Sequence, residues 1–494
     1  MYCVNDVHGR VNPTISENGC YEGGISRLST YLSKKIASNP TGSVFLNAGD
    51  LWQDTYDSAM NKGELLTKAM VQMDCEAIAL GNHEFDWGVD QIKANRAIAE
   101  SSSNKTQFTF LGCNVYNYGG TTSTHADDLC SSYKVINRGD VRIGLIGAIG
   151  EKQLTSITSS NWENLTFRDP VPIVKSLSRK LRNEEKCDVI VYLFHGSLNQ
   201  AEPDALSSID PETNKPYVDA GFLGHSHQFE NEMINSVPWI QSYQHGAVLG
   251  RITLKVENGN VSCTYCPDYS STSGYSGRNE NGWGSGTNSI YGQADDVNIK
   301  NIVDEYITPS FIQTRDQEVV TLENAPSWIR KDAGKIQALA TSKYIDGLRS
   351  LGESIPNVDI VINNGNRDDI QVPSNNRLKR ENIFNLIPFT NKTIIASVSG
   401  RDIINECVMY SNPYYIVSET SLTLDPNTYY TVACIDYLLL HKNTSRQYNY
   451  FSSYTSSLYT IEKFPYAITW DYFAEQPTFD MNILSSVAFT GLTY

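Results

Sequence analysis

The stretch Gly81-Asn82-His83-Glu84-Phe85-Asp86 follows directly after an apolar run, Ala77-Ile78-Ala79-Leu80. A short apolar run bounded by glycine and polar residues predicts a buried strand. The polar stretch then stands at the carboxyl end of that strand, which is where open α/β sheets carry their functional sites. Residues 77–86 therefore predict a strand of an α/β domain with site residues at its end.

The same pattern extends over the N-terminal half of the chain. Apolar runs predict further buried strands at residues 43–47, 141–149 and 188–194. Helix-like spacing of apolar residues is present at residues 25–36, 63–73 and 89–100. Strands that alternate with helices indicate a layered α/β domain.

The length of the chain, 494 residues, favours two domains, because one hydrophobic core rarely serves so many residues. We predict a first domain at residues 1–267, a linker loop and helix at 268–315, and a second, smaller α/β domain at 316–494. The second domain has apolar runs of its own, at 358–362, 393–398 and 429–434. Within the linker, residues 282–286 are interpreted as flexible and residues 298–312 as a helix that joins the domains.

The charge of the chain limits its partners. There are 39 basic and 55 acidic residues, for a net charge of −16, so nucleic-acid polymers and anionic membranes are excluded as expected partners. No run is apolar enough for a transmembrane segment, and the sequence given shows no signal peptide. Asn-x-Ser/Thr sequons nevertheless favour an extracellular or cell-surface location, and they begin at Asn104, Asn164, Asn260, Asn391 and Asn443. The oligomeric state stays open.

Polar motifs recur in order along the first domain, each at the end of a predicted strand. They are Asp6-x-His8, Gly49-Asp50, Gly81-Asn82-His83, His195-Gly196 and Gly224-His225-Ser226-His227. Each motif alone is common in proteins without a site. Together they take five of the eight histidines of the chain, and this ordered set predicts a metal centre.

Hydrolysis of a phosphate ester is the chemistry that such a centre suits. The reaction needs a hydroxide at neutral pH and positive charge near the phosphate oxygens, and two divalent ions about 3.5–4 Å apart supply both. We predict Asp50 as the bridging ligand. Asp6, His8 and His227 would hold one ion, and Asn82, His195 and His225 the other. Zinc is the expected metal, with manganese, iron, cobalt or magnesium as alternatives that suit mixed nitrogen and oxygen ligands.

These motifs resemble those of the calcineurin-like metallophosphoesterases. The run Asn82-His83-Glu84-Phe85-Asp86-Trp87-Gly88 resembles the 5'-nucleotidase branch, which also contains UDP-sugar hydrolases and cyclic-nucleotide phosphodiesterases. The resemblance implies a four-layer β-sandwich flanked by helices, followed by a smaller α/β substrate-binding domain. It also implies two catalytic residues that bind no metal: His83, which stabilises the transition state or leaving group, and Asp86, which orients it.

The resemblance extends in fragments to the second domain. Residues 362–367 resemble the branch's Asn-Gly-Gly-Gly-Ile-Arg loop, one residue short, which implies that Asn363 contacts the base and Arg367 a phosphate. Arg330 is the candidate for a second substrate-binding arginine. Tyr414 and Tyr437 are the candidates for the two aromatic side chains between which the base stacks.

Two details of this second domain depart from the branch or stay open. Tyr415 is the alternative to Tyr414, one residue along. After Tyr437 the branch has a Gly-Gly-Asp-Gly turn, whereas residues 439–443 read Leu-Leu-His-Lys-Asn, so the aspartate that grips the ribose is missing at that spacing. The identity of the substrate is therefore less defined than the chemistry.

The resemblance implies a dimetal phosphohydrolase that removes the 5'-phosphate from nucleoside monophosphates, with a small nucleotide as its partner. UDP-sugars, nucleoside diphosphates and 2',3'-cyclic nucleotides are alternative substrates, and a phosphoprotein phosphatase uses the same metal core. A non-catalytic nucleotide-binding module would be expected to have a broken ligand set, yet every ligand position is filled.

Two smaller features complete the sequence. Cys263-x-x-Cys266 lacks a second cysteine pair, so a disulfide within a hairpin is favoured over a structural zinc site. His245 follows a predicted strand at its active-site end. It is interpreted either as a residue that supports the metal ligands or as a surface histidine, and the sequence does not decide between the two.

Overall fold

The computed structural model describes residues 1–494 except 17–18, 102–106, 120–122, 163, 270–275, 330–331, 364–368, 410–414, 418–421, 440–450, 452–453, 455–456, 487–491 and 494. The chain divides into two compact units. Unit 1 comprises Met1–Gln53, Asp57–Ile157 and Asn161–Ile307, and unit 2 comprises Asp54–Tyr56, Thr158–Ser160 and Thr308–Tyr494.

The first sheet of unit 1 has five strands in the order β17-β1-β4-β5-β6. Its members are β1 (Tyr2–Val4), β4 (Phe45–Asn47), β5 (Cys75–Ala79), β6 (Thr109–Leu111) and β17 (Gly250–Arg251). The four strands from β1 to β6 pair in parallel, and β17 closes one edge in the antiparallel direction. The predicted strands at 43–47 and 77–80 are thus β4 and β5.

The second sheet of unit 1 has six strands in the order β15-β16-β14-β11-β9-β8. They are β8 (Tyr133–Arg138), β9 (Val141–Ile149), β11 (Val189–His195), β14 (Ala220–Leu223), β15 (Phe229–Ile234) and β16 (Val237–Ser242). The four inner strands run parallel, and the edge strands β8 and β15 run antiparallel to their neighbours. Strand β9 has the predicted bounds, because a run made almost entirely of apolar or small residues suits a strand buried on both faces.

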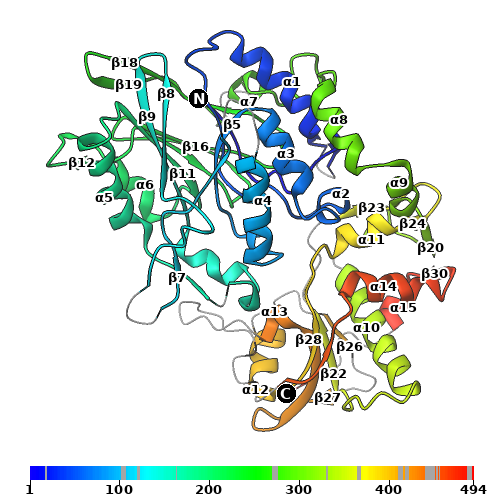
Figure 1. Ribbon diagram of the computed structural model, residues 1–494. Coiled ribbons are helices and arrows are strands. Elements are labelled where there is room, and N and C mark those ends of the chain that lie inside the picture. Colours follow the sequence, from blue (N-terminus) through cyan, green and yellow to red (C-terminus); the bar gives the residue numbers. More distant parts are fainter. Residues whose placement is uncertain are drawn as a thin grey trace. The chain divides into compact units, whose positions relative to one another are not determined.

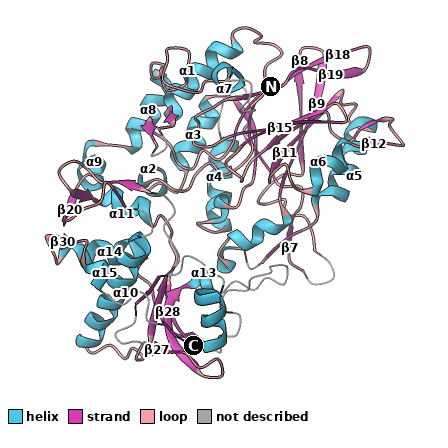
Figure 2. Cartoon of the chain, turned by 180° about the vertical axis from the view of Figure 1, so that it is seen from behind, coloured by secondary structure: helices cyan, strands magenta, loops and turns pink. Residues whose placement is uncertain are grey.

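The two sheets pack against one another, and helices cover their outer faces (Figures 1 and 2). Side chains from both sheets meet in one core, among them Leu46, Ala77, Val191 and Phe222. The first sheet is covered by α3 (Glu64–Gln72) and α4 (Val89–Ser101), and the second by α5 (Pro170–Asn183) and α6 (Ala201–Ser207). Helix α8 (Val297–Tyr306) packs against α3 and α1 (Gly24–Ile36). This is the predicted four-layer sandwich.

Short elements fill the remainder of unit 1. They are β2 (Thr14–Ile15), β3 (Tyr21–Glu22), α2 (Tyr56–Ala59), η1 (His83–Phe85), β7 (Val115–Asn117), β10 (Leu165–Phe167), β12 (Ile209–Asp210), β13 (Lys215–Pro216), β18 (Thr253–Glu257), β19 (Asn260–Tyr265) and α7 (Ser276–Glu280). The expectation that residues 282–286 are a flexible linker is wrong. The ring of Trp283 packs 5.2 Å from that of Phe229 and 5.5 Å from that of Tyr243, which anchors the segment to unit 1.

Unit 2 is built on a five-stranded sheet in the order β26-β22-β28-β25-β29. Its strands are β22 (Ile360–Asn363), β25 (Thr393–Ser399), β26 (Tyr415–Val417), β28 (Tyr429–Ile435) and β29 (Ser457–Ile461). Successive residues of β22 and β25 face opposite sides, as the two-residue period of a strand requires. Val361 and Ile395 join one core with α10 (Asp332–Ser350) and α14 (Pro465–Ala474), whereas Ile362 and Ile394 join another.

The remaining elements of unit 2 are α9 (Pro309–Arg315), β20 (Glu318–Glu323), β21 (Trp328–Ile329), β23 (Ile370–Gln371), β24 (Arg377–Lys379), α11 (Arg380–Leu386), α12 (Gly400–Ile403), η5 (Ile404–Met409), β27 (Leu422–Thr423), α13 (Asp436–Leu439), β30 (Thr478–Asp480), α15 (Ile483–Ser486) and β31 (Leu492–Thr493). The single helix expected at 298–312 is wrong, because α8 and α9 are separate. Pro309 cannot continue the preceding helix, and Thr308 caps the new one by accepting the Phe311 N–H.

The expected hairpin disulfide is also wrong. Cys263 lies in β19 and Cys266 directly beyond its end, and all ten cysteines of the chain are free thiols in the structure. Three residues of extended chain span about 10 Å, whereas the two Cα atoms of a disulfide lie about 4.4–6.8 Å apart. Among the described residues, no helix has the length and apolar character needed to cross a membrane.

A candidate two-metal centre

The predicted ligands of unit 1 all stand at the carboxyl ends of strands. Asp6 and His8 follow β1, Asp50 follows β4, and Asn82 follows β5 in the first sheet. In the second sheet His195 ends β11, and His225 and His227 follow β14. Both sheets thus contribute side chains to one site.

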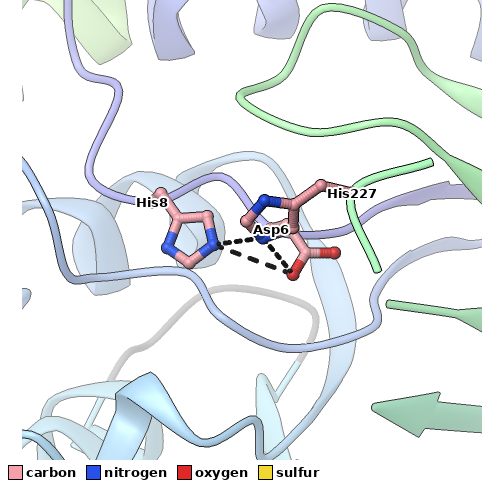
Figure 3. A group of neighbouring side chains, drawn as sticks. All are labelled: Asp6, His8 and His227. Carbon is pink, nitrogen blue, oxygen red and sulfur yellow. Dashed lines mark hydrogen bonds and ion pairs between the residues drawn. The ribbon is translucent and has the colours of Figure 1, made fainter. Parts of the chain in front are cut away.

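Asp6, His8 and His227 form one group of converging ligand atoms (Figure 3). The Nε2 atoms of His8 and His227 lie 2.9 Å apart. The Oδ1 atom of Asp6 lies 3.3 Å from Nε2 of His227 and 3.8 Å from Nε2 of His8. Two imidazole nitrogens and one carboxylate oxygen that face a common point are a ligand set for a single divalent ion.

A second group is formed by Asp50, Asn82, His195 and His225. The Oδ2 atom of Asp50 lies 3.1 Å from Nε2 of His195. The Oδ1 atom of Asn82 lies 3.2 Å from the same nitrogen and 3.1 Å from Nδ1 of His225. Asp50 Oδ2 is also 3.8 Å from Nε2 of His8. One carboxylate oxygen therefore faces both groups, as a bridging ligand must.

The residues present fit two divalent cations. Asp6, His8 and His195 are fully buried and Asp50 is 1% exposed, and burying several ionisable groups together is costly unless charge compensates them. Among the described ion pairs, Asp6 and Asp50 contact only histidines, with no lysine or arginine. Imidazole and carboxylate donors without a basic side chain are the composition of a metal site.

Neighbouring groups fix the ligands in position. Nδ1 of His195 lies 2.9 Å from the Ala48 carbonyl oxygen, which can only accept, so Nδ1 carries the proton and Nε2 presents its lone pair to the centre. The carboxylate of Asp6 accepts hydrogen bonds from the backbone N–H of His225, at 3.0 Å, and from the side-chain amide of Asn5, at 2.7 Å.

The backbone at the site is strained. Asp6, His8, Asp50, His225 and His227 all have positive φ, between 49° and 77°. This left-handed region is uncommon for residues other than glycine, and such strain is concentrated at functional sites. A Cβ atom at Gly81 would lie 2.2 Å from Oδ1 of Asp50, so the glycine of this motif is required by the close approach of two loops.

Glu84 links two of the ligand loops, a role that the sequence analysis missed although the residue lies in the opening motif. Its buried carboxylate accepts the backbone N–H groups of Asp50 at 2.9 Å, Leu51 at 2.8 Å and Gly81 at 2.7 Å. Burial, together with the charge of Asp50, raises the pKa of Glu84 to about 7. The loops after β4 and β5 therefore share one anchor.

Gln241 supports the loop that carries His225 and His227, and no sequence signal marked it. The residue is fully buried on β16, and its Oε1 atom accepts the His227 N–H at 3.0 Å. Its amide nitrogen donates to Ser226 Oγ and, at 2.8 Å, to Glu230.

His83 and Asp86 form a pair beside the two ligand groups. Nδ1 of His83 lies 2.7 Å from Oδ2 of Asp86, which fixes the orientation of the imidazole. The His83 backbone N–H donates to Oδ1 of Asp50 at 2.9 Å, and its ring lies 5.1 Å from that of His8. The structure thus brings both residues to the edge of the centre.

The predicted substrate-binding residues belong to unit 2, where Arg330, Arg367 and Tyr414 lie outside the described residues. Asn363 ends β22, is 3% exposed and donates to the side-chain oxygen of Gln337. Tyr437 lies in α13, half-buried against the core that contains Ile362. The region after Tyr437, where the ribose-binding aspartate is missing, is also outside the described residues from 440 to 450.

Comparison with protein families identifies the N-terminal part of the chain. Residues 1–229, which contain all the ligands of the centre, match the calcineurin-like phosphoesterases. The match ends at the first residue of β15, so it includes every strand that carries a ligand.

Curated proteins similar to this chain include an apyrase and a 5'-nucleotidase. The apyrase, from Tabanus yao, is 31% identical over 232 residues, covering 46% of this chain and 38% of that protein. The 5'-nucleotidase, from Bos taurus, is 27% identical over 285 residues, covering 52% of this chain and 46% of that protein. The matched segments therefore span less than half the length of these relatives.

Solved structures resemble the chain over almost its full length. The 5'-nucleotidase precursor from Thermus thermophilus aligns with a TM-score of 0.68 over 97% of this chain and 96% of that one, at 16% identity. At that identity the likeness concerns the fold, and it confirms the predicted fold class. With the sequence relatives, it also confirms the resemblance to the 5'-nucleotidase branch.

Proposed function

We propose that the protein is a two-metal phosphohydrolase that removes the 5'-phosphate from nucleoside monophosphates. The observation that carries the proposal is the position of Asp50 Oδ2, 3.1 Å from His195 Nε2 and 3.8 Å from His8 Nε2, between two ligand groups. The family match supports phosphoester hydrolysis, and the 5'-nucleotidase names of several relatives support the substrate class.

Seven residues would hold the metals: Asp6, His8, Asp50, Asn82, His195, His225 and His227. Two divalent ions there would supply a nucleophile at neutral pH and offset the charge of the phosphate. We propose zinc first, with manganese, iron, cobalt or magnesium as alternatives, because the donors are mixed imidazole and oxygen.

His83 would act on the phosphate and the leaving group. Asp86 holds Nδ1 of His83 at 2.7 Å, so the proton of the imidazole can be exchanged with a substrate at Nε2, and the carboxylate stabilises the imidazolium that forms. The 6% exposure of His83 limits competing water.

Unit 2 would bind the nucleotide, through Asn363, Arg330, Arg367, Tyr414 and Tyr437. UDP-sugars, nucleoside diphosphates and 2',3'-cyclic nucleotides remain as outcomes of the substrate test. We also propose an extracellular or cell-surface location. A cell wall protein of Listeria monocytogenes, 23% identical over 303 residues, supports that location.

A nucleotide panel tests the proposal. The protein is stripped with a chelator, zinc, manganese, cobalt and magnesium are restored in turn, and products are resolved from AMP, ADP, UDP-glucose and 2',3'-cyclic AMP. We expect phosphate release to be fastest from AMP and to require the restored metal. His83→Ala should keep the metals and lower the rate by about 10²–10⁴-fold.

A matched control is His125→Ala, since His125 also pairs through Nδ1 with a carboxylate, Asp127, at 2.8 Å, and is no ligand of the centre. Its rate should equal that of the unsubstituted protein. Turnover of another panel member in preference to AMP would reassign the substrate. Metal-loaded protein that hydrolyses none of the four would replace the proposal by a non-catalytic nucleotide-binding role.

A further inference from the structure

His245 lies against the metal centre, although the sequence left its location open. It is 6% exposed and stands in the loop after β16, with a φ of 57°. Its backbone N–H donates to the carbonyl oxygen of Asp6 at 2.7 Å. A buried histidine whose main chain is bonded to a metal ligand is no surface residue.

The imidazole of His245 is held by a chain of charged groups. Its Nδ1 atom lies 2.7 Å from Oε1 of Glu22, which is 2% exposed. The other carboxylate oxygen of Glu22 accepts from Thr14 Oγ1 at 2.7 Å and lies 3.3 Å from Nε of Arg10. Burial opposes ionisation of Glu22, but His245 and Arg10 together lower its pKa to about 2. The carboxylate is therefore charged and fixes the ring.

The ring of His245 faces two of the three residues in the group formed by Asp6, His8 and His227. Its centroid lies 5.8 Å from that of His8, with the ring planes at 85°, and 6.4 Å from that of His227, with the planes at 57°. The ring of His8 therefore packs against two imidazoles that are not predicted ligands. The centroid of His83 lies 5.1 Å from that of His8, and the centroid of His245 lies 5.8 Å from it. Each of these two imidazoles has its own carboxylate at 2.7 Å from Nδ1.

We propose that His245, held by Glu22 and Arg10, is a positioning residue for the ion bound by Asp6, His8 and His227. The inference rests on the two-metal centre of the proposed function, but not on its substrate. His245 acts through two routes. Its ring packs edge-on against His8 and at a tilt against His227, which limits the rotation of both imidazole ligands. Its N–H fixes the backbone of Asp6.

The structure gives this role a selective consequence. Disturbing Glu22 or His245 should weaken the binding of one ion and spare the other, because the Ala48 carbonyl, and not His245, holds His195. Substitutions of residues that orient metal ligands typically weaken binding by about 10–100-fold. If the residue only filled space, its substitution would weaken the binding of both ions equally, or of neither.

Metal titration of three variants tests the inference. Glu22→Gln keeps the shape of the side chain and removes its charge, His245→Phe keeps a ring and removes its bond to Glu22, and His125→Phe is the matched control. Chelator-stripped protein is titrated with manganese, and the two dissociation constants are obtained by calorimetry. In Glu22→Gln and His245→Phe we expect one constant to rise about 10–100-fold and the other to stay within about threefold. The control should match the unsubstituted protein.

Two results would overturn the inference: both constants unchanged in the folded variants, or both raised to the same degree. Circular dichroism monitors folding, and if His245→Phe does not fold, Glu22→Gln carries the test because it leaves the ring in place. Failure of the proposed function is distinguished separately. It would appear as an unsubstituted protein that binds two manganese ions and hydrolyses no nucleotide.

Discussion

The predicted ligands His195 and His227 lie in the two halves of the candidate centre but are held in different ways. His195 is fully buried, and a main-chain carbonyl, that of Ala48, fixes its Nδ1 atom. The His227 side chain is 27% exposed, and its supports are the side chains of Gln241 and His245. We call these the inner half, with Asp50, Asn82, His195 and His225, and the outer half, with Asp6, His8 and His227.

In the inner half the fold determines the position of His195, whereas in the outer half single side chains determine the positions of the ligands. In the inner half, the position of His195 depends on strands β4 and β11, which no single substitution removes. In the outer half, the ligand positions depend on Asn5, Gln241 and the Glu22–His245 pair, each of which can be substituted alone. We therefore expect single substitutions to change metal binding by degrees in the outer half. In the inner half, metal binding should be lost together with the local structure.

The largest effect is expected where the two halves meet. Asp50→Asn removes the charge that faces both ligand groups, so neither ion keeps a complete site. We expect phosphate release from AMP to fall by about 10³-fold or more, and both metal dissociation constants to rise. Activity assays with calorimetry measure both quantities, and Asp140→Asn, in an exposed turn, is the control. Loss of only one ion would contradict the bridging position of Asp50.

The inner half could be predicted in large part from the sequence. The strands that carry it are apolar runs followed at once by Gly-Asp, Gly-Asn-His and His-Gly, so strand and ligand are read from adjacent residues. Both signals are local: a buried parallel strand needs an unbroken apolar run, and its end is where the sheet presents polar groups.

Of the supports of the outer half, the sequence offered only His245, as one of two interpretations, because the contacts join residues far apart in the chain. Glu22 and His245 are separated by 223 positions, and neither stands in a motif. Asn5 adjoins Asp6, but a side chain that bonds to a distant loop has no sequence signature of its own. Glu84, which anchors two loops of the inner half, lies inside the opening motif and was missed for the same reason. Only packing of the β2–β3 hairpin beside the loop after β16 reveals these contacts.

The second domain was predictable in its strands but not in its connections. The runs at 358–362, 393–398 and 429–434 correspond to β22, β25 and β28. The prediction of a single helix at 298–312 was wrong. The spacing of apolar residues continues through Thr308-Pro309, but Pro309 cannot continue a helix that begins before it and instead starts a new one. All the nucleotide-binding residues carried over by resemblance stay predictions, and three of them, Arg330, Arg367 and Tyr414, lie outside the described residues.

A smaller effect is expected on the free energy of unfolding, which should fall more for a substitution in the inner half than for one in the outer half. His195→Ala empties a fully buried position and leaves the Ala48 carbonyl without its donor, which should lower the free energy of unfolding by about 2–4 kcal/mol. His227→Ala removes a side chain that is 27% exposed and should cost about 1 kcal/mol or less. Urea denaturation of the chelator-treated proteins compares them. Equal losses would show that the two halves are held alike.

The most local effect is expected from the support of the outer half. Gln241→Met keeps the length of a fully buried side chain but removes the oxygen that accepts the His227 N–H and the amide that donates to Ser226 and Glu230. Leaving these groups unpaired should cost about 1–3 kcal/mol of stability, and the freed loop should weaken one metal ion several-fold. The matched control is Gln107→Met, where the glutamine is exposed and lies away from the centre.

Since the hydrogen bonds of Gln241 hold His227 and its neighbours rather than His195, the second ion should bind Gln241→Met as it binds the unsubstituted protein. If both ions weakened together in the calorimetric titration, the halves would be coupled through the sheet, and the separation between a fold-imposed half and an adjustable half would be wrong.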